Sequence, residues 1–450
     1  MESITVGILG LISLLALIAV RVPIAYSMII VGAAGISFLD GPAILLNQLK
    51  DLAYGQFSIY DLSVVPLFIL MGAIASRTGL SRDLFRAANA WVGWMRGGVA
   101  MSAIVACTGF GAVCGSSLAT ASTMGRVALP ELKRYKYSGS LATGTIAAGG
   151  VLGILIPPSV VLIIYAIIVE ANVVTMFMAA LIPGLIAVLF FIVTIYIYVR
   201  LSPNSGPRGE RVSRKELIAS SINILPVGIV FGVVIGGLYF GFFSPTPAAS
   251  VGVVMVSLFG LFRGKLTIST AKDAMTETIR TAGMIYLILL GAEILKIFMS
   301  RGGVPQALAE WMSVSGMSPM LILIILLVSL IVLGCLMDSL SMILLAIPFF
   351  WPVLVTLNGG DYATAVQSPF GMTTEELKIW FGILALIVVE LGLITPPVGM
   401  NVFIISAQAK DVPMIDTFFG VLPFFGAEIV RVIILIAFPA LALWLPNLLS

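Results

Sequence analysis

The chain lacks histidine altogether and is poor in charge: only 10% of its 450 residues are charged, with 24 Lys and Arg against 21 Asp and Glu. Ordinary soluble domains are about 25% charged, so this composition excludes a soluble enzyme, a disordered protein and a nucleic-acid-binding protein. Without His, zinc or haem held by imidazole and any Ser-His or Cys-His catalytic arrangement are excluded as well. The net charge of +3 says little about partners.

Cysteine is scarce too, and Cys107, Cys114 and Cys335 all lie in apolar stretches. We predict that they are small buried side chains and not disulfides or metal ligands. The sequence has no phosphate-binding loop motif, so ATP hydrolysis by this chain is unsupported. Residues Met1-Glu2-Ser3 carry no basic charge. The first apolar run is therefore expected to be a retained membrane span and not a cleaved signal peptide.

Apolar residues are present in excess: they make up 60% of the chain, mostly in continuous runs. Such runs exclude a transmembrane barrel, whose strands alternate apolar and polar residues, and predict an all-α polytopic membrane protein. Two apolar regions, 97–132 (the first hairpin) and 319–355 (the second hairpin), are interrupted by small or polar residues, and each has the wrong length for one or two crossings. Ten complete crossings are expected near 3–20, 22–39, 62–76, 140–168, 176–199, 218–240, 246–262, 281–299, 379–406 and 417–445.

Basic residues set the predicted orientation. Segments 77–96 and 126–136 each carry four Arg or Lys against one acidic residue. They flank the first hairpin, so by the positive-inside rule both of its ends lie on the cytoplasmic side, and the region must enter and return. With the linker 201–217 also cytoplasmic, all but five of the basic residues fall on that side, and both termini are predicted to be periplasmic.

An internal duplication divides the chain into a first repeat at 1–200 and a second repeat at 218–450. The corresponding segments are Ser76-Arg77 with Ser300-Arg301 at an offset of 224 residues, Gly115–Thr120 with Met337–Met342 at 222, and Ile156–Ser159 with Thr395–Val398 at 239. Each repeat holds five crossings and one hairpin; because five is odd, the second repeat starts on the opposite side. Inverted repeats with broken helices are typical of secondary transporters, which bind substrate near the membrane midplane.

The hairpin tips carry the candidate chemistry. Residues 111–120 at the first tip are rich in Gly, Ser and Thr. Their hydroxyls and freed carbonyls offer oxygen ligands for a hard cation such as Na⁺, and amides at a half-helix N-terminus can hold an anionic substrate. The alternative is a GxxxG helix contact between Gly111 and Gly115. At the second tip, Asp338 either sets the charge of a cation site or caps the following half-helix.

Two Pro-Pro elements, at 153–159 and 392–401, lie within the predicted crossings at 140–168 and 379–406. Proline removes backbone donors and leaves carbonyls without partners, and inside a bilayer a cation can take the place of those partners. A simple helix kink explains one such element. Two elements at repeat-equivalent positions, each beside a polar hairpin tip, favour a binding site.

Other charged residues inside apolar runs are less informative. Glu390 lies one turn before the second break and is a candidate brace for it. Glu293 and Lys296 stand three residues apart, as do Glu428 and Arg431. Each of these two pairs is predicted to form an ion pair within its helix or, alternatively, to contact another subunit.

Motifs along nearly the whole chain carry a family resemblance. They are Gly-Ser-Ser-x-Ala-Thr at 115–120, Pro130-Glu131, Ile-Pro-Pro-Ser at 156–159, Phe177 to Pro183-Gly184, Met337-Asp338 with Pro348 and Pro352, Thr-Pro-Pro-Val-Gly-x-Asn at 395–401, and Leu443-Trp444-Leu445-Pro446. Over about residues 20–446 the chain thus resembles the large membrane subunit of tripartite ATP-independent periplasmic (TRAP) transporters. It departs from the family pattern at Ser244–Ala248, Tyr165-Ala166 and Arg431.

This resemblance implies an elevator-type importer, driven by Na⁺, of an organic acid such as a C4-dicarboxylate, sialic acid or a sugar acid. It implies a bacterial inner-membrane location, a periplasmic substrate-binding protein and a small four-helix membrane subunit, expected here as a separate chain. Both hairpins and both broken helices would move against scaffold helices and an arm helix. The implied Na⁺ ligands are Ser116, Ser117, Gly153, Pro157, Gly334, Asp338, Thr395 and Gly399. The implied substrate contacts are Ser159, Asn401 and Thr120.

Two other hypotheses stay open at the level of sequence. A self-sufficient Na⁺-coupled carboxylate carrier of the same broad fold would work without a binding protein. A non-transporting membrane scaffold or receptor would explain the hydrophobicity but would not require two polar hairpin tips. Enzyme activity is not expected, because no pairing of a nucleophile with a base is visible.

Overall fold

The computed structural model describes residues 3–314 and 316–449, and every regular element of that part of the chain is a helix, as the composition predicts. The first half contains α1 (Ser3–Ala19), α2 (Ile24–Asp40), α3 (Pro42–Phe57), the 3₁₀ turn η1 (Tyr60–Ser63), α4 (Val64–Arg77), α5 (Leu80–Val92), α6 (Gly98–Cys114), α7 (Ser117–Arg134), α8 (Gly139–Leu155), α9 (Val160–Ile168) and α10 (Val173–Leu201). The second half contains α11 (Arg214–Tyr239), α12 (Pro245–Phe262), α13 (Ile268–Arg301), α14 (Val304–Val314), α15 (Pro319–Gly334), α16 (Ser339–Asn358), α17 (Thr374–Gly392), α18 (Met400–Gln408), α19 (Met414–Ala437) and α20 (Ala440–Leu449).

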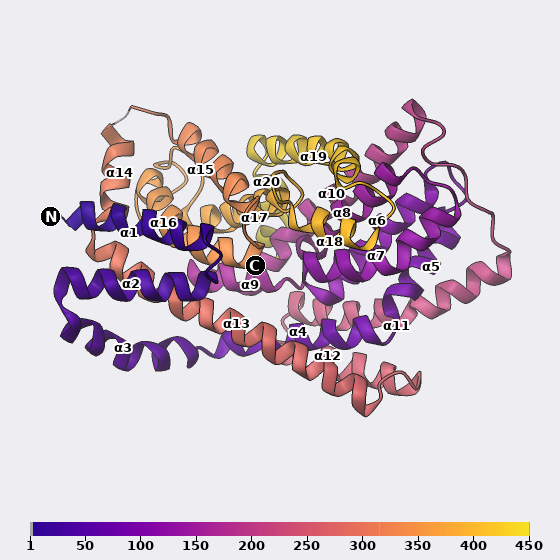
Figure 1. The fold of residues 1–450 in the computed structure, drawn as a ribbon, viewed down its shortest axis with the longest axis horizontal. Helices are drawn as coiled ribbons and strands as arrows, with labels where there is room; N and C mark the ends of the chain where they lie inside the picture. The colour runs from indigo at the N-terminus through magenta and orange to yellow at the C-terminus, as the bar shows by residue number, and fades with distance from the viewer. Residues whose placement is uncertain (1–2, 315, 450) are drawn as a thin grey trace.

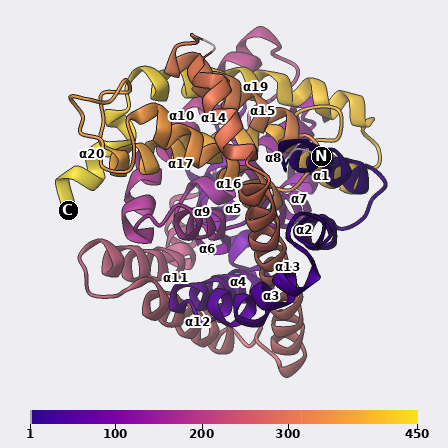
Figure 2. The same cartoon turned by 90° about the vertical axis from the view of Figure 1, so that its left-hand side faces the viewer.

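The helices form an elongated bundle, with α13 running along much of its length (Figure 1). Seen from one end, α3, α4, α11, α12 and α13 lie on one side, and α10, α15, α17 and α19 lie on the opposite side (Figure 2). Helices α6 to α9 and α16 lie between these two groups. The centre of the molecule is thus built largely from the segments in which the sequence places hairpins and a Pro-Pro break.

Both predicted hairpins are present as pairs of contacting helices, α6 with α7 and α15 with α16. Between the first pair, Gly115 has a φ of 63°, a left-handed conformation that glycine adopts without strain. Ser116 then caps α7, and Asp338 caps α16, each by accepting a hydrogen bond from the backbone N–H group three residues later. The two caps occupy equivalent positions, 222 residues apart.

Both predicted Pro-Pro breaks are present as well. Residues 156–159 separate α8 from α9, which meet at a bend of 47°. Residues 393–399 separate α17 from α18. The Pro157–Pro158 and Pro396–Pro397 peptide bonds are both cis. The first break is buried, whereas both prolines of the second break are exposed.

Two segments predicted to be loops contain helices. The predicted outer loop 40–61 contains α3, because Pro42 supplies a φ suited to the first helical position. The predicted cytoplasmic loop 263–280 is largely helical, because the Thr267 hydroxyl caps α13 and the helix then continues for 34 residues. The prediction was wrong at both places since hydropathy detects apolar crossings and not polar helices.

Two further boundaries differ from the prediction. The segment 417–445 is not one helix: it divides into α19 and α20 around Pro439, because the residue before a proline is disfavoured in helical conformation. The linker 201–217 is shorter than predicted, because Ser213 accepts a hydrogen bond from the backbone N–H of Glu216 and so begins α11. The remaining linker runs from 202 to 213.

By length and apolar composition, seven of the described helices could cross a membrane, or eight if α8 and α9 count as one bent span. Helices α1 and α2 have 17 residues each. At this length they rise about 26 Å, slightly less than a hydrocarbon core of about 30 Å. Helix α16 alone is long enough to cross, although the sequence places it in a hairpin. The chain is therefore a multi-pass membrane protein, and the count of ten crossings stays a prediction.

Pairs of glycines bring each hairpin into backbone contact with its broken helix. A β-carbon on Gly111 of α6 would overlap the Cα atom of Gly153 in α8. A β-carbon on Gly392 of α17 would lie 2.6 Å from the Cα atom of Gly334 in α15. The two pairs are related by 223 and 239 residues, close to the offsets of the duplication. The matching contacts support two structural repeats, while their inverted orientation stays a prediction.

Candidate functional site

Oxygen atoms converge where the first hairpin tip meets the first break. A β-carbon on Gly153 would lie 2.9 Å from the carbonyl oxygen of Ser116 and would overlap Oγ1 of Thr120. That Thr120 oxygen is buried and has no hydrogen-bond partner in the described part of the chain. A β-carbon on Gly115 would lie 2.8 Å from the carbonyl oxygen of Pro158. The structure therefore brings together hydroxyl and carbonyl oxygens of the kind that bind Na⁺ in transporter helix breaks.

At the second tip, the carboxylate of Asp338 serves as a helix cap. It accepts a hydrogen bond from the backbone N–H of Ser341 at 3.2 Å and another from the hydroxyl of Ser341 at 2.5 Å. Capping, one of the two roles considered for Asp338, is thus confirmed. Thr395 donates its hydroxyl to the carbonyl oxygen of Leu391 at 2.6 Å, and Gly399 begins α18 with a φ of 58°. Cation binding by these residues stays a prediction.

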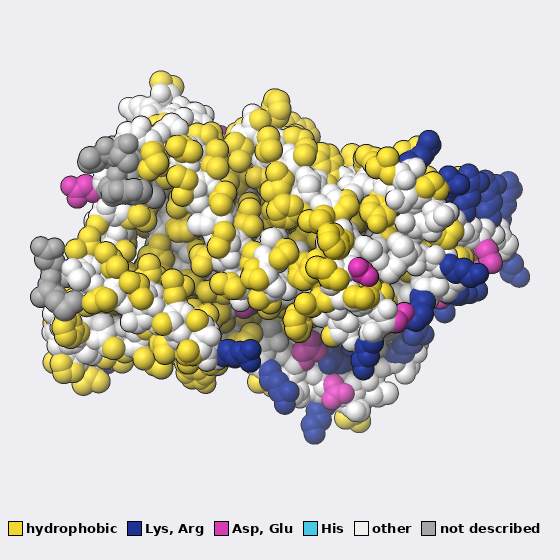
Figure 3. Space-filling model, turned by 45° about the horizontal axis from the view of Figure 1, so that its top comes forward, with side chains coloured by type: hydrophobic (Ala, Val, Ile, Leu, Met, Phe, Trp, Pro, Cys, Tyr) yellow, Lys and Arg dark blue, Asp and Glu magenta, His cyan; other side chains and the backbone are white. Residues whose placement is uncertain are grey.

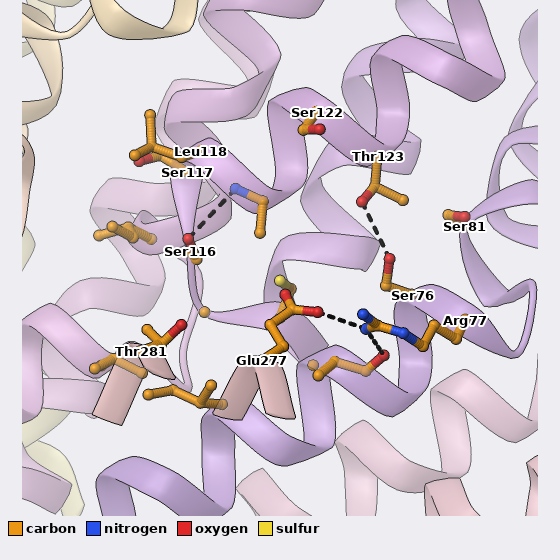
Figure 4. A pocket seen from close by; sticks show the side chains of 18 of the residues that line it. Ser76, Arg77, Ser81, Ser116, Ser117, Leu118, Ser122, Thr123, Glu277 and Thr281 are labelled. Carbon is orange, nitrogen blue, oxygen red and sulfur yellow. Dashed lines mark hydrogen bonds and ion pairs between the residues drawn. The ribbon is translucent and has the colours of Figure 1, made fainter. Parts of the chain in front are cut away.

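A cavity of about 990 Å³ lies beside both hairpin tips (Figure 4). Its wall includes Ser116 and Ser117 from the first tip and Asp338 and Ser339 from the second. Its basic residues are Arg77, Arg82, Arg126 and Lys265, and its acidic residues are Glu277 and Asp338. An excess of basic side chains around a cavity attracts an anionic ligand.

Two contacts visible in Figure 4 connect the helices around this cavity. Arg77 of α4 forms an ion pair with Glu277 of α13 at 2.6 Å. The hydroxyls of Ser76 in α4 and Thr123 in α7 lie 3.1 Å apart. The second contact joins the outer helix α4 to the first hairpin, so the cavity lies at the boundary between the two.

The position of the cavity follows the distribution of charge. On the face shown in Figure 3, Lys and Arg side chains gather at one end of the molecule. The four basic residues of the cavity belong to the set that the sequence predicts to be cytoplasmic. The cavity therefore lies toward the predicted cytoplasmic side.

The three predicted substrate contacts lie behind the cavity wall. Ser159 is fully buried and caps α9 by accepting a hydrogen bond from the backbone N–H of Leu162 at 3.3 Å. Asn401 is fully buried and donates its amide to the carbonyl oxygen of Ala147 at 3.3 Å. Thr120 is buried next to Gly153. Contact of these three with substrate stays a prediction.

Glu390 has a different position from the one hypothesised. Instead of bracing the second break, its fully buried carboxylate contacts both hairpin tips, accepting hydrogen bonds from the hydroxyls of Ser117 at 3.4 Å and Ser339 at 2.5 Å. An acid inside an apolar run is itself a signal of function. Its partners lie 273 and 51 residues away in sequence, so spacing alone could not identify them.

Both predicted ion pairs within helices are present. Lys296 lies 3.2 Å from Glu293 at a partly exposed position. Arg431 pairs with Glu428, both side chains are buried, and Arg431 also donates to the carbonyl oxygen of Pro183 in α10 at 3.0 Å. Because Arg431 is enclosed within this chain, the alternative of a contact between this pair and another subunit is wrong.

Comparison with known proteins relates the whole chain to membrane transporters. A family model described as "Tripartite ATP-independent periplasmic transporter, DctM component" matches residues 11–441. The C4-dicarboxylate TRAP transporter large permease protein DctM of Pseudomonas aeruginosa is 34% identical over 405 residues, which cover 89% of this chain and 90% of the relative. The sialic acid TRAP transporter large permease protein SiaM of Vibrio cholerae is 29% identical over 445 residues, covering 96% of this chain and 97% of the relative.

Two solved structures share the fold. The YdaH transporter of Alcanivorax borkumensis superimposes with a TM-score of 0.67 at 12% identity and covers 98% of both chains. The MtrF protein of Neisseria gonorrhoeae, whose structure is described under a class of antimetabolite efflux pumps, superimposes with a TM-score of 0.56 at 15% identity, covering 97% of this chain and 95% of its own. At these identities the similarity concerns the fold alone.

Proposed function

Because the chain belongs to the DctM-component family of tripartite ATP-independent periplasmic transporters, we propose that it imports a small organic acid into the cytoplasm using a Na⁺ gradient. The observation that carries this proposal is the juxtaposition of an oxygen-lined hairpin tip with a cavity richer in basic than in acidic side chains. A periplasmic binding protein would deliver the acid, and a small four-helix membrane subunit would pack on the outer helices.

The substrate class we propose first is a C4-dicarboxylate. Three relatives that are 30–34% identical bear that substrate in their names, whereas the SiaM relative, named for sialic acid, is 29% identical. All of these substrates are carboxylates, which suits the basic wall of the cavity. Arginine binds carboxylates through paired N–H groups, so Arg77, Arg82 and Arg126 are candidate contacts along the exit path.

The packing supports a mechanism in which the hairpins and broken helices move as one body. Backbone contacts at Gly111 with Gly153, and at Gly334 with Gly392, leave no room for either hairpin to slide against its broken helix. The contacts with α4 are fewer, and one of them is the hydroxyl pair of Ser76 and Thr123. Since the cavity lies toward the predicted cytoplasmic side, we assign the described conformation to the inward-facing state of an elevator cycle.

Uptake should depend on both Na⁺ and the binding protein. The chain, reconstituted in vesicles with its small membrane subunit, is expected to accumulate radiolabelled succinate only with an inward Na⁺ gradient and the cognate binding protein outside. Replacing Na⁺ by K⁺, or omitting the binding protein, should each reduce uptake to the level of empty vesicles. Uptake by this chain alone, without a binding protein, would instead identify a self-sufficient carrier of the same fold.

The two roles of Asp338 can be separated by substitution. Asn caps helices about as well as Asp, whereas Ala costs about 1 kcal/mol of stability. We expect Asp338→Ala to unfold at a lower temperature than wild type, and Asp338→Asn to unfold near the wild-type temperature in Na⁺-free buffer. If the carboxylate charge also helps to bind Na⁺, Asp338→Asn should raise the Na⁺ concentration for half-maximal uptake about tenfold, equivalent to about 1.4 kcal/mol.

The matched control for this substitution is Asp361→Asn, which makes the same change at an exposed position of the outer loop. It should change neither stability nor Na⁺ dependence. An Asp338→Asn variant with the Na⁺ dependence of wild type would restrict Asp338 to capping.

A further inference from the structure

One buried carboxylate links the two hairpin tips. Oε1 of Glu390 accepts hydrogen bonds from the hydroxyl of Ser117 at 3.4 Å and from the hydroxyl of Ser339 at 2.5 Å. Ser117 is the first residue of α7, directly after its cap, and Ser339 is the first residue of α16, directly after its cap. A single oxygen atom therefore joins equivalent positions of two hairpins that are 222 residues apart in sequence.

The surroundings of Glu390 are asymmetric. In the first repeat, the position 239 residues earlier is Val151, an apolar residue. One carboxylate in the second broken helix thus serves both tips. It lies two residues before Gly392, where α17 is in backbone contact with Gly334 of the second hairpin. Any displacement of α17 that moves the second tip will therefore also move the acceptor of Ser117.

Burying this carboxylate is costly, which argues against an incidental position. Glu390 is fully buried, and its second oxygen, Oε2, has no hydrogen-bond partner in the described part of the chain. The two hydroxyls and the positive N-terminal ends of α7 and α16 offset part of that cost. They do so only while both tips stay close to Glu390. The free energy of burying the carboxylate therefore depends on the positions of both tips.

We propose that Glu390 is a positioning residue that couples the two hairpin tips, so that Na⁺ binding at one tip changes the affinity for Na⁺ at the other. This inference rests on the proposed Na⁺-driven function. Binding at the first tip fixes Ser116 and hence Ser117, Ser117 holds Glu390, and Glu390 holds Ser339 beside Asp338. The coupling makes loading of the two sites cooperative, which keeps a half-loaded transport body from moving.

Native cysteines provide a reporter at each tip. Cys114 ends α6 at the first tip, and Cys335 follows α15 at the second; both are buried in the described conformation. The rate at which each thiol reacts with a maleimide, resolved by mass spectrometry of its peptide, reports the opening of its own tip. In the full-length chain with its small subunit in lipid vesicles, Na⁺ is expected to slow the reaction at both thiols.

The test is a double-mutant cycle read at the opposite tip. Ser117→Ala, at the first tip, should raise the Na⁺ concentration that half-protects Cys335, at the second tip, about fivefold, the lower end of typical coupling between sites. Glu390→Met should produce a similar shift. The double variant should shift no further than Glu390→Met alone, because both substitutions break the same link.

Reciprocity gives a second measurement that does not depend on the folding of Glu390→Met. Ser339→Ala, at the second tip, should shift the protection of Cys114 by about the same factor as Ser117→Ala shifts that of Cys335. Glu390→Gln, which retains an acceptor oxygen, should lie between wild type and Glu390→Met. Ser102→Ala is the matched control, because this buried serine of α6 bonds only the Gly98 carbonyl oxygen of its own helix, at 2.7 Å; it should shift neither thiol.

The outcomes separate the inference from the function on which it rests. If Na⁺ protects both thiols in wild type, but Ser117→Ala leaves the response of Cys335 unchanged or its effect multiplies with that of Glu390→Met, the coupling role is wrong while Na⁺ binding stands. If Na⁺ protects neither thiol in wild type, while K⁺ gives the same rates, the proposed Na⁺ coupling fails and the inference fails with it. A non-multiplicative, reciprocal pair of shifts supports the coupling role.

Discussion

Replacing Gly111 with alanine is expected to abolish transport and to destabilise the protein by about 3 kcal/mol, the upper end of the usual cost of overpacking a core. The added methyl group would overlap the Cα atom of Gly153, and its next neighbours are the backbone N at 3.1 Å and the backbone C at 3.2 Å of the same residue. Backbone atoms cannot move away as a side chain can, so α6 and α8 would have to separate. That separation would also move the Ser116 carbonyl away from Gly153.

The matched control lies two residues earlier in the same helix. A β-carbon on Gly109 would lie 2.8 Å from Cδ2 of Leu84, the flexible end of a side chain that can rotate. Both substitutions gain the same helix propensity, about 1 kcal/mol in favour of alanine. Gly109→Ala should therefore retain stability and uptake. The two variants are compared by thermal unfolding in detergent and by uptake in vesicles, and equal stability of the two would contradict a backbone contact at Gly111.

The sequence could predict the parts of the fold that leave a local pattern. Tips of small and polar residues inside apolar runs predicted both hairpins, and proline pairs predicted both breaks, because each feature interrupts a helix within a few residues. Helix α3 and the first turns of α13 were missed, since they are polar helices whose start depends on Pro42 and on the cap at Thr267. Hydropathy carries no signal for such a start.

The site could be predicted only where its residues belong to one tip or one break. Ser116 and Gly153 were expected together, and the structure brings them together. The contact of Glu390 with Ser117 and Ser339 depends on the way two repeats pack against each other. No spacing in the sequence encodes that contact. The same holds for the basic wall of the cavity, which collects Arg77, Arg126 and Lys265 from separate segments.

Replacing Arg431 with methionine is expected to have the largest effect on stability, a loss of about 3–5 kcal/mol, because the substitution would leave the carboxylate of Glu428 buried without a counter-charge. Both side chains are buried, at 0% and 1% exposure, so water cannot compensate for the lost partner. The hydrogen bond from Arg431 to the Pro183 carbonyl oxygen would be lost as well, which loosens α19 against α10. The measurement is the unfolding midpoint of the purified chain in detergent.

The double variant Glu428→Leu with Arg431→Met distinguishes a structural pair from a functional one. Replacing a buried ion pair by apolar residues of similar volume is often neutral or stabilising, so the double variant should recover most of the stability that Arg431→Met loses. If the pair only holds α19 in place, uptake and its Na⁺ dependence should recover with stability. Recovery of stability without recovery of uptake would show instead that this charge pair takes part in the transport cycle, for which its burial beside α10 would then provide the starting point.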